Sequence, residues 1–210
     1  MEQLEKSPEN SDPDSKIFGL TGGIGSGKTA VAKIIENMGF SVYYSDIRAK
    51  ELVNESQFLR SRIIELLGEE SYDKQGVYNR KFVSTIVFED LEKLEALNAI
   101  IHPAVRADFQ NWLGKNRDKE IIFKETALLF ELDLDTACYK SVLVTSEDNS
   151  RIKRVMDRDD KTYREVQSIM AKQLPEKDKI KRADVVIYNN GTLEDLQIEV
   201  EKIIQEISTI

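Results

Sequence analysis

The sequence predicts an α/β fold in which a parallel sheet is covered by helices on both faces. Two observations carry this prediction: β-rich runs alternate with helical patterns, and a glycine-rich phosphate-binding motif joins the first run to the first helix. Strands that alternate with helices form right-handed crossovers, which place the strands parallel to one another. A chain of 210 residues with 40% hydrophobic residues has enough apolar surface to bury such a core.

The expected strands are short runs rich in aliphatic and aromatic residues. After the first run, apolar residues recur at helical spacing from Val31 to Met38, and Gly39 follows in a position where helices commonly end. The expected strands are Lys16–Leu20, Ser41–Ser45, Glu120–Lys124, Lys140–Thr145 and Ala183–Tyr188.

The distances between these runs predict a tail and two insertions. Residues 1–15 are rich in Glu, Asp, Ser and Pro, the composition of a disordered tail, so 16–210 are expected to form one domain. About 57–118 show helical periodicity and far exceed the length of one crossover, which indicates an inserted helical region. The charged stretch of about 147–181 has few apolar residues and is interpreted as a helical lid.

Charge, cysteine content and the length of apolar runs limit the binding partners and the cellular location that we expect. Thirty basic and 38 acidic residues give a net charge of −8, which disfavours non-specific attraction to nucleic acid or to an anionic membrane. Cys138 is the single cysteine, so it is expected to pack among apolar neighbours rather than form a disulfide. Apolar runs fall short of the roughly 18 residues of a membrane span. We therefore expect a cytoplasmic protein that binds neither nucleic acid nor membrane.

The strongest motif satisfies G-x-x-x-x-G-K-[ST] between an expected strand and an expected helix. Its glycines let backbone N–H groups point at phosphate oxygens, and the helix adds the positive end of its dipole. Lys28 is expected to contact the β- and γ-phosphates of a nucleoside triphosphate, and the Thr29 hydroxyl to bind Mg²⁺. The alternative is a turn that only connects a strand to a helix. The predicted phosphate loop is Gly22, Gly23, Ile24, Gly25, Ser26, Gly27, Lys28 and Thr29.

Other segments narrow the class of nucleotide-binding protein. A GTPase would carry an Asn-Lys-x-Asp run, whereas the nearest string is Asn116-Arg117-Asp118. A motor or helicase would end an apolar strand in Asp-Glu, whereas the third expected strand leads into Phe123-Lys124-Glu125. A small-molecule kinase fits best, because the inserted region at about 57–118 would bind the acceptor and the lid at about 147–181 would close over the phosphates. A regulator that uses ATP to control a partner is the contrasting class.

Asp46 is the candidate general base. It follows the second expected strand, and ligands of open α/β sheets bind outside the carboxyl ends of the strands. We therefore expect its carboxylate to face the phosphate loop and accept the proton of an acceptor hydroxyl. The alternative is an N-cap for the helix that begins near Ile47.

The sequence also makes predictions for a pair of arginines, for the single histidine and for two aromatic residues. Arg154 and Arg158 share one helix face at i, i+4 and are expected to contact the transferring phosphoryl group, with solvated surface charge as the alternative. His102-Pro103 is expected to form a turn between two helices. Phe109 and Trp112 are expected in the core.

Taken together, these residues resemble the dephospho-coenzyme A kinase family from about Lys16 to Gly191. The resemblance begins with Thr-Gly-Gly-Ile-Gly-Ser-Gly-Lys-Thr at 21–29 and includes Asp46. The later matching segments, in order, are Gly76 with Arg80, Val87-Phe88, Ile101-His102-Pro103, Leu128-Leu129-Phe130-Glu131, Arg151–Arg158, Gln173-Leu174-Pro175, Ala183-Asp184, and Asn189 with Gly191. The sequence departs from the family pattern at Tyr44, at the segment Glu125-Thr126-Ala127, at Ser150 and at Ile169.

The resemblance implies a P-loop NTPase fold and a complete reaction. ATP and Mg²⁺ would phosphorylate the ribose 3′-hydroxyl of dephospho-coenzyme A, giving coenzyme A and ADP, with another nucleotide or nucleoside kinase as the alternative enzyme. It implies catalysis by Asp46, Lys28 and Arg154. It further implies nucleotide contacts from Arg154, Arg158, Asn189 and Gly191, and acceptor contacts from Asp46, Arg80, His102 and Glu125.

Overall fold

The computed structural model describes residues 15–208, and these form two compact units. The first unit comprises the described residues before 43 and after 115, and the second unit comprises residues 43–115. The predicted tail of 1–15 lies, except for Ser15, outside the described residues.

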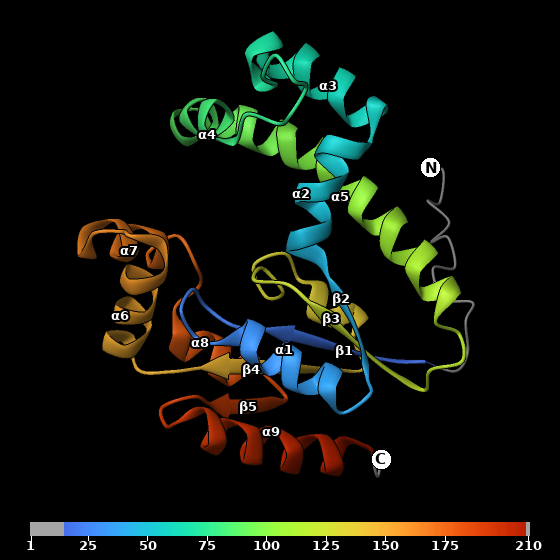
Figure 1. The fold of residues 1–210 in the computed structure, drawn as a ribbon, viewed down its shortest axis with the longest axis vertical. Helices are drawn as coiled ribbons and strands as arrows, with labels where there is room; N and C mark the ends of the chain where they lie inside the picture. The colour runs from blue at the N-terminus through green and yellow to red at the C-terminus, as the bar shows by residue number, and fades with distance from the viewer. Residues whose placement is uncertain (1–14, 209–210) are drawn as a thin grey trace, which may run out of the picture. The chain divides into compact units, whose positions relative to one another are not determined.

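A five-stranded sheet organises the first unit (Figure 1). The strand order is β2-β3-β1-β4-β5, and β1 pairs in parallel with both β3 and β4, while β4 pairs in parallel with β5. The predicted α/β fold with a parallel sheet is confirmed, and every expected strand is present with ends that differ by at most two residues. The strands are β1 (Lys16–Thr21), β2 (Ser41–Tyr44), β3 (Ile121–Glu125), β4 (Lys140–Thr145) and β5 (Val185–Tyr188).

The middle of each inner strand is apolar because both faces of the sheet are covered. Phe18 of β1, Phe123 of β3 and Val142 of β4 are fully buried. Ala183 and Asp184 precede β5 instead of extending it, since the Asp184 carboxylate accepts hydrogen bonds from the Ser141 backbone N–H and hydroxyl, at 2.7 and 2.6 Å. These bonds hold the pKa of Asp184 below its ordinary value.

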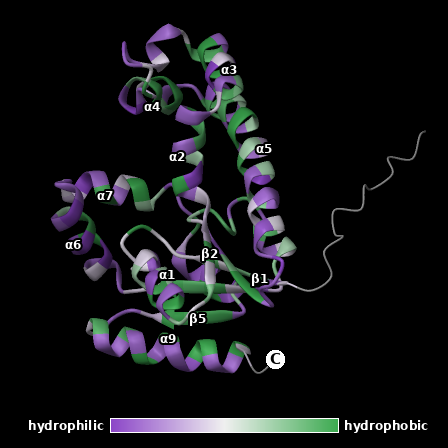
Figure 2. Ribbon diagram, turned by 45° about the vertical axis from the view of Figure 1, so that its right-hand side comes forward, coloured by the Kyte–Doolittle hydropathy of each residue, from purple (hydrophilic) through white to green (hydrophobic). Residues whose placement is uncertain are grey.

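The helices of this unit pack against the sheet and against one another. Helix α1 packs against α9, α8 packs against β4, and α9 packs against β5. Figure 2 shows hydrophobic residues alternating with polar ones along α9, where Leu196, Val200, Ile204 and Ile207 form the buried face. The helices of this unit are α1 (Lys28–Asn37), α6 (Asp148–Asp159), α7 (Tyr163–Met170), α8 (Glu176–Arg182) and α9 (Leu193–Ser208), with a 3₁₀ turn η2 (Leu134–Ala137).

Cys138 lies after η2 and packs beside Leu129 and Leu143, as expected. Burial raises the pKa of its thiol to about 11, so the thiol is protonated near neutral pH. None of the helices within 15–208 is long and apolar enough to cross a membrane.

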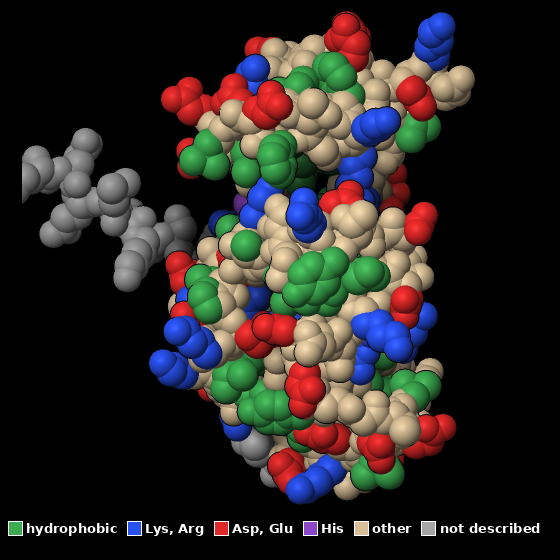
Figure 3. All heavy atoms as spheres, turned by 90° about the vertical axis from the view of Figure 1, so that its left-hand side faces the viewer, with side chains coloured by type: hydrophobic (Ala, Val, Ile, Leu, Met, Phe, Trp, Pro, Cys, Tyr) green, Lys and Arg blue, Asp and Glu red, His purple; other side chains and the backbone are tan. Residues whose placement is uncertain are grey.

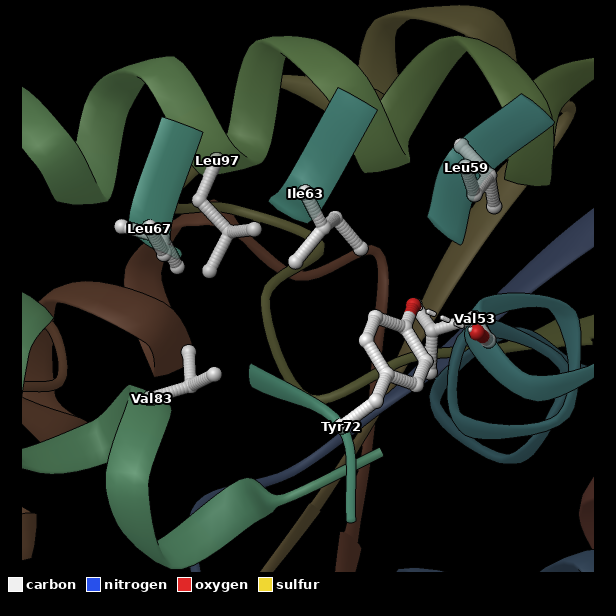
Figure 4. Packing of buried hydrophobic residues seen from close by; sticks show 7 residues of the cluster. All are labelled: Val53, Leu59, Ile63, Leu67, Tyr72, Val83 and Leu97. Atoms are coloured by element: carbon white, nitrogen blue, oxygen red, sulfur yellow. Dashed lines mark hydrogen bonds between the residues drawn. The ribbon is translucent and has the colours of Figure 1, made fainter. Parts of the chain in front are cut away.

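The second unit is helical and has its own core. Figure 4 shows this core, in which Tyr72 donates a hydrogen bond of 2.7 Å to the Val53 carbonyl oxygen. The predicted insertion of 57–118 covers most of this unit, which also includes the helix that carries Asp46. The core residues are Val53, Leu59, Ile63, Leu67, Tyr72, Val83 and Leu97. The elements are α2 (Ser45–Glu55), α3 (Gln57–Leu67), η1 (Glu69–Ser71), α4 (Arg80–Glu89) and α5 (Leu91–Lys115).

The predicted turn at His102-Pro103 is wrong, because both residues lie inside α5. Proline removes one helical hydrogen bond and disfavours helical geometry in the residue before it. The helix nevertheless continues, since α5 packs against α2, α3 and α4 along its length. Phe109 is buried as expected, whereas Trp112 is half-buried, and its ring lies 6.2 Å from that of Phe109.

Candidate active site

The phosphate loop lies at the carboxyl end of β1, the central strand, and leads directly into α1. Gly27 has φ of +98°, a left-handed conformation that glycine adopts without strain, and a Cβ there would collide with the Asn189 side chain. The first N–H groups of a helix have no acceptors within it, so the loop and α1 present donors and a positive dipole end to an anion.

Asn189 and Arg154 hold this loop through a chain of hydrogen bonds. Asn189, which follows β5, is 7% exposed, and its Nδ2 donates to the Ser26 carbonyl oxygen at 2.8 Å. Arg154 of α6 donates to the Asn189 carbonyl oxygen at 3.0 Å and approaches the Gly25 carbonyl oxygen at 3.5 Å. The structure therefore brings two predicted nucleotide contacts, Asn189 and Arg154, to the loop.

Lys28 and Glu125 form a buried ion pair beside the loop. Glu125 ends β3 and lies in register with Leu20 of β1, and the Lys28 and Glu125 side chains are only 13% and 5% exposed. The sequence predicted these residues for different ligands, Lys28 for the nucleotide and Glu125 for the acceptor. The pairing shows that the Glu125 carboxylate holds the Lys28 ammonium at the carboxyl end of the sheet.

Three other predicted ligand contacts lie outside the hydrogen-bond chain formed by Asn189 and Arg154: Thr29, Arg158 and Gly191. Thr29 is exposed in the first turn of α1. Arg158 is 63% exposed, and its guanidinium donates to both carboxylate oxygens of Asp159, at 2.7 and 2.8 Å. Gly191 lies against Asp195 at the start of α9. Arg158 and Arg154 therefore share a helix but have different hydrogen-bond partners.

This difference predicts unequal effects on catalysis. Arg154→Ala is expected to lower kcat by about 10²-fold, because its guanidinium lies at the loop predicted to hold the transferring group. Arg158→Ala is expected to have a smaller effect, since Asp159 already binds its guanidinium. Steady-state kinetics on both purified variants measure the difference. Wild-type turnover in both variants would show that the two arginines are surface charges without a role in catalysis.

Asp46 lies in the first turn of α2, in the second unit. The alternative that Asp46 is the N-cap is wrong: the helix begins one residue earlier, at Ser45, and its N-cap is Tyr44, without a side-chain cap hydrogen bond. A carboxylate in the first turn still interacts favourably with the helix dipole. Its role as a base remains a prediction.

Asp108 of α5 fixes the chain on both sides of Asp46. Its carboxylate accepts from the Tyr43 hydroxyl at 2.8 Å, and from Nε and a terminal nitrogen of Arg48 at 2.9 Å each. The Arg48 guanidinium holds the pKa of Asp108 below its ordinary value, and burial together with Asp108 raises the pKa of Tyr43. Sequence reasoning missed Asp108, because nothing in its local pattern distinguishes it from other helix-surface carboxylates.

The other predicted acceptor contacts also lie in the second unit. Arg80 is the exposed first residue of α4. His102 lines a hollow of about 490 Å³ on α5, together with Arg106 and Gln110. Partial desolvation and the charge of Arg106 hold the pKa of His102 below its ordinary value, which favours the neutral imidazole.

The Dephospho-CoA kinase family model matches residues 16–195. The chain belongs to the dephospho-CoA kinase family. The family's member in Fusobacterium nucleatum is 42% identical over 191 residues, which cover 91% of this chain and 98% of that protein. The one in Leptospira interrogans is 39% identical over 193 residues, covering 91% and 93%.

Solved structures agree with membership of the dephospho-CoA kinase family. A crystal structure from Thermus thermophilus has a TM-score of 0.82 at 32% identity, covering 92% of this chain and 98% of that one. Dephospho-CoA kinase from Campylobacter jejuni has a TM-score of 0.68 at 26% identity, covering 92% and 97%. Shikimate kinase from Acinetobacter baumannii shares the fold, with a TM-score of 0.51 at 15% identity. The predicted resemblance, the P-loop kinase fold and kinase activity with ATP as substrate are confirmed, and the regulator alternative is not favoured.

Proposed function

We propose that the loop at 22–29 holds ATP while Asp46 prepares dephospho-CoA for phosphorylation at its ribose 3′-hydroxyl. The observation that carries this proposal is the phosphate loop at the end of β1, fixed by Asn189 and Arg154, in a chain that matches dephospho-CoA kinases from 16 to 195. This reaction is the last step of coenzyme A biosynthesis and releases ADP.

The residues of the site have two proposed roles in phosphoryl transfer: they position the reacting groups and they neutralise charge. Asp46 accepts the proton of the 3′-hydroxyl, whose oxygen then bonds to the γ-phosphorus as the bond to the ADP oxygen breaks. Lys28 and Arg154 compensate the negative charge of the phosphoryl group during transfer. Asn189 and the loop N–H groups hold the remaining phosphates, so the reacting atoms are oriented in advance.

Mg²⁺ fits the residues present. It usually keeps several waters and takes one or two protein oxygens together with substrate phosphates. The Thr29 hydroxyl is exposed beside Lys28 and supplies such an oxygen, while the described residues contain no cluster of three or more His, Cys, Asp or Glu that could hold a metal. Bound Mg²⁺ would neutralise phosphate charge, with Thr29 as its ligand from this chain.

The two insertions also have proposed roles in substrate binding. We infer that 147–181, which carry Arg154 and Arg158, close over the nucleotide, and that 57–118, with Arg80 and His102, bind the acceptor. Acidic and basic side chains are interspersed on the face in Figure 3 rather than segregated by sign. On this face, that mixture supports a small-molecule partner rather than nucleic acid. We infer a cytoplasmic setting from the family of biosynthetic enzymes to which the chain belongs.

The acceptor is tested by comparing candidate substrates at fixed ATP and Mg²⁺. ADP release is expected with dephospho-CoA and expected to be far slower with AMP, with a nucleoside or with shikimate. Faster ADP release with AMP or a nucleoside would make the chain a different nucleotide kinase, and ADP release without transfer to any acceptor would contradict the proposed function.

A further inference from the structure

Arg151 of α6 is a buried guanidinium that contacts the phosphate loop, although its role is not among those predicted from the sequence. Its side chain is 3% exposed, and its Nε donates to the Ile24 carbonyl oxygen at 3.0 Å. One terminal nitrogen also lies 3.0 Å from Glu176 and 3.3 Å from Asp148. A buried charge needs such partners, and Glu176 is the less exposed of the two carboxylates.

The second glycine of the loop is explained by Arg151. A Cβ at Gly23 would collide with a terminal nitrogen of the guanidinium and lie 2.9 Å from its central carbon. The pattern G-x-x-x-x-G-K-[ST] leaves this position open. The guanidinium therefore occupies the space that any other residue at position 23 would fill.

Ile24 is held on three sides. Its N–H donates to Oε1 of Gln173 at 3.0 Å, its carbonyl oxygen accepts from Arg151, and its side chain packs beside Val155 and Val166. Ile24 directly precedes Gly25–Thr29. The peptide that enters the phosphate-binding turn is thus fixed by side chains from α6 and from the segment between α7 and α8.

The partners of Arg151 and Ile24 are themselves anchored. Lys179 of α8 is 1% exposed and lies 3.0 Å from Glu131. The same Glu131 oxygen accepts from the Leu174 N–H at 3.2 Å. Gln173 and Glu176, on either side of Leu174 and Pro175, are thereby kept at fixed positions against the loop.

We propose that Arg151, paired with Glu176, is a positioning residue that presets the phosphate loop for nucleotide binding. The inference deepens the proposed function, because it takes the loop to be the site of the ATP phosphates. Arg151 acts through the Ile24 peptide, so its loss should weaken nucleotide binding while leaving the acceptor's own binding unchanged.

Arg151→Gln tests this proposal by calorimetric titration of the full chain with ADP in the presence of Mg²⁺. The dissociation constant for ADP is expected to rise about tenfold, the size of one lost charge-assisted hydrogen bond. The KM for ATP should rise in parallel, and the KM for dephospho-CoA should stay at the wild-type value. Arg151→Lys keeps the charge beside Glu176 but lacks the fork that also reaches Ile24, so it should weaken ADP binding as well.

Arg182→Gln is the matched control, since Arg182 of α8 makes comparable bonds to Asp133, Asp135 and the Phe130 carbonyl oxygen. It should lower the melting temperature without changing ADP affinity. Wild-type ADP affinity in folded Arg151→Gln would overturn the proposal, as would equal weakening in Arg182→Gln. If Arg151→Gln does not fold, wild-type affinity in Arg151→Lys overturns it. Failure of the wild-type protein to bind ADP would instead overturn nucleotide binding at the loop.

Discussion

Replacing Lys28 with alanine is expected to lower kcat by about 10²- to 10³-fold even at saturating ATP. In the proposed mechanism the ammonium follows the γ-phosphoryl group through transfer, so its contribution would be larger in the transition state than in the bound substrate. Higher ATP concentration therefore cannot restore the rate. Single-turnover measurements at saturating ATP and dephospho-CoA separate this effect from product release.

The buried partner of Lys28 requires a control. Lys28→Ala leaves the Glu125 carboxylate buried without its ammonium, and breaking a buried ion pair costs about 3–5 kcal/mol of stability. In the double variant Lys28→Ala/Glu125→Gln this uncompensated charge is absent, so the fold should be recovered while turnover stays low. Recovery of turnover along with the fold would show that Lys28 is needed for structure and not for chemistry.

Asp46→Asn is expected to slow turnover by about 10²- to 10⁴-fold, or about 3 to 5 kcal/mol of barrier. The amide has nearly the same shape as the carboxylate but cannot accept the proton of a ribose hydroxyl. Because asparagine nearly matches the shape of aspartate and Asp46 is not the N-cap residue of α2, the melting temperature should stay near that of the wild type. ATP affinity should also be almost unchanged, since the loop holds the triphosphate. Steady-state kinetics, thermal unfolding and calorimetric titration with ATP measure these three properties of the variant.

Asp178→Asn provides the matched control, because Asp178 is an exposed aspartate in the first turn of α8. It should leave turnover unchanged. Wild-type turnover in folded Asp46→Asn would contradict the general-base assignment, and Glu125 would then be the remaining candidate acceptor for the proton.

The strands and the phosphate loop could be predicted because their signals are local. A parallel strand covered on both faces is mostly apolar, and Leu20 and Val142 are buried residues of such strands. The loop motif is contiguous in the sequence. The interior of α5 could not be predicted locally. Proline at 103 favours a helix end, and only packing against three other helices keeps it within one.

The contacts that fix the site could not be predicted because they join residues far apart in the sequence. Arg151 and Ile24 are 127 positions apart, and Asn189 and Ser26 are 163 apart. Helical spacing placed Arg154 and Arg158 on one face, but Asp159 next to Arg158 gives that guanidinium a different partner. Lys28 and Glu125 were both selected from the sequence, and their direct pairing follows only from the register of β1 and β3.

The central claim is that the γ-phosphoryl group of ATP is transferred to the ribose 3′-hydroxyl of dephospho-CoA, and the reaction product tests it most directly. After incubation with ATP and Mg²⁺, mass spectrometry should show dephospho-CoA converted to a product one phosphoryl group heavier. Phosphorus NMR of that product should show a new phosphate monoester coupled to the ribose 3′ proton. Unmodified dephospho-CoA after prolonged incubation with folded, ATP-binding protein would contradict the claim, as would a new phosphoryl group at any other position.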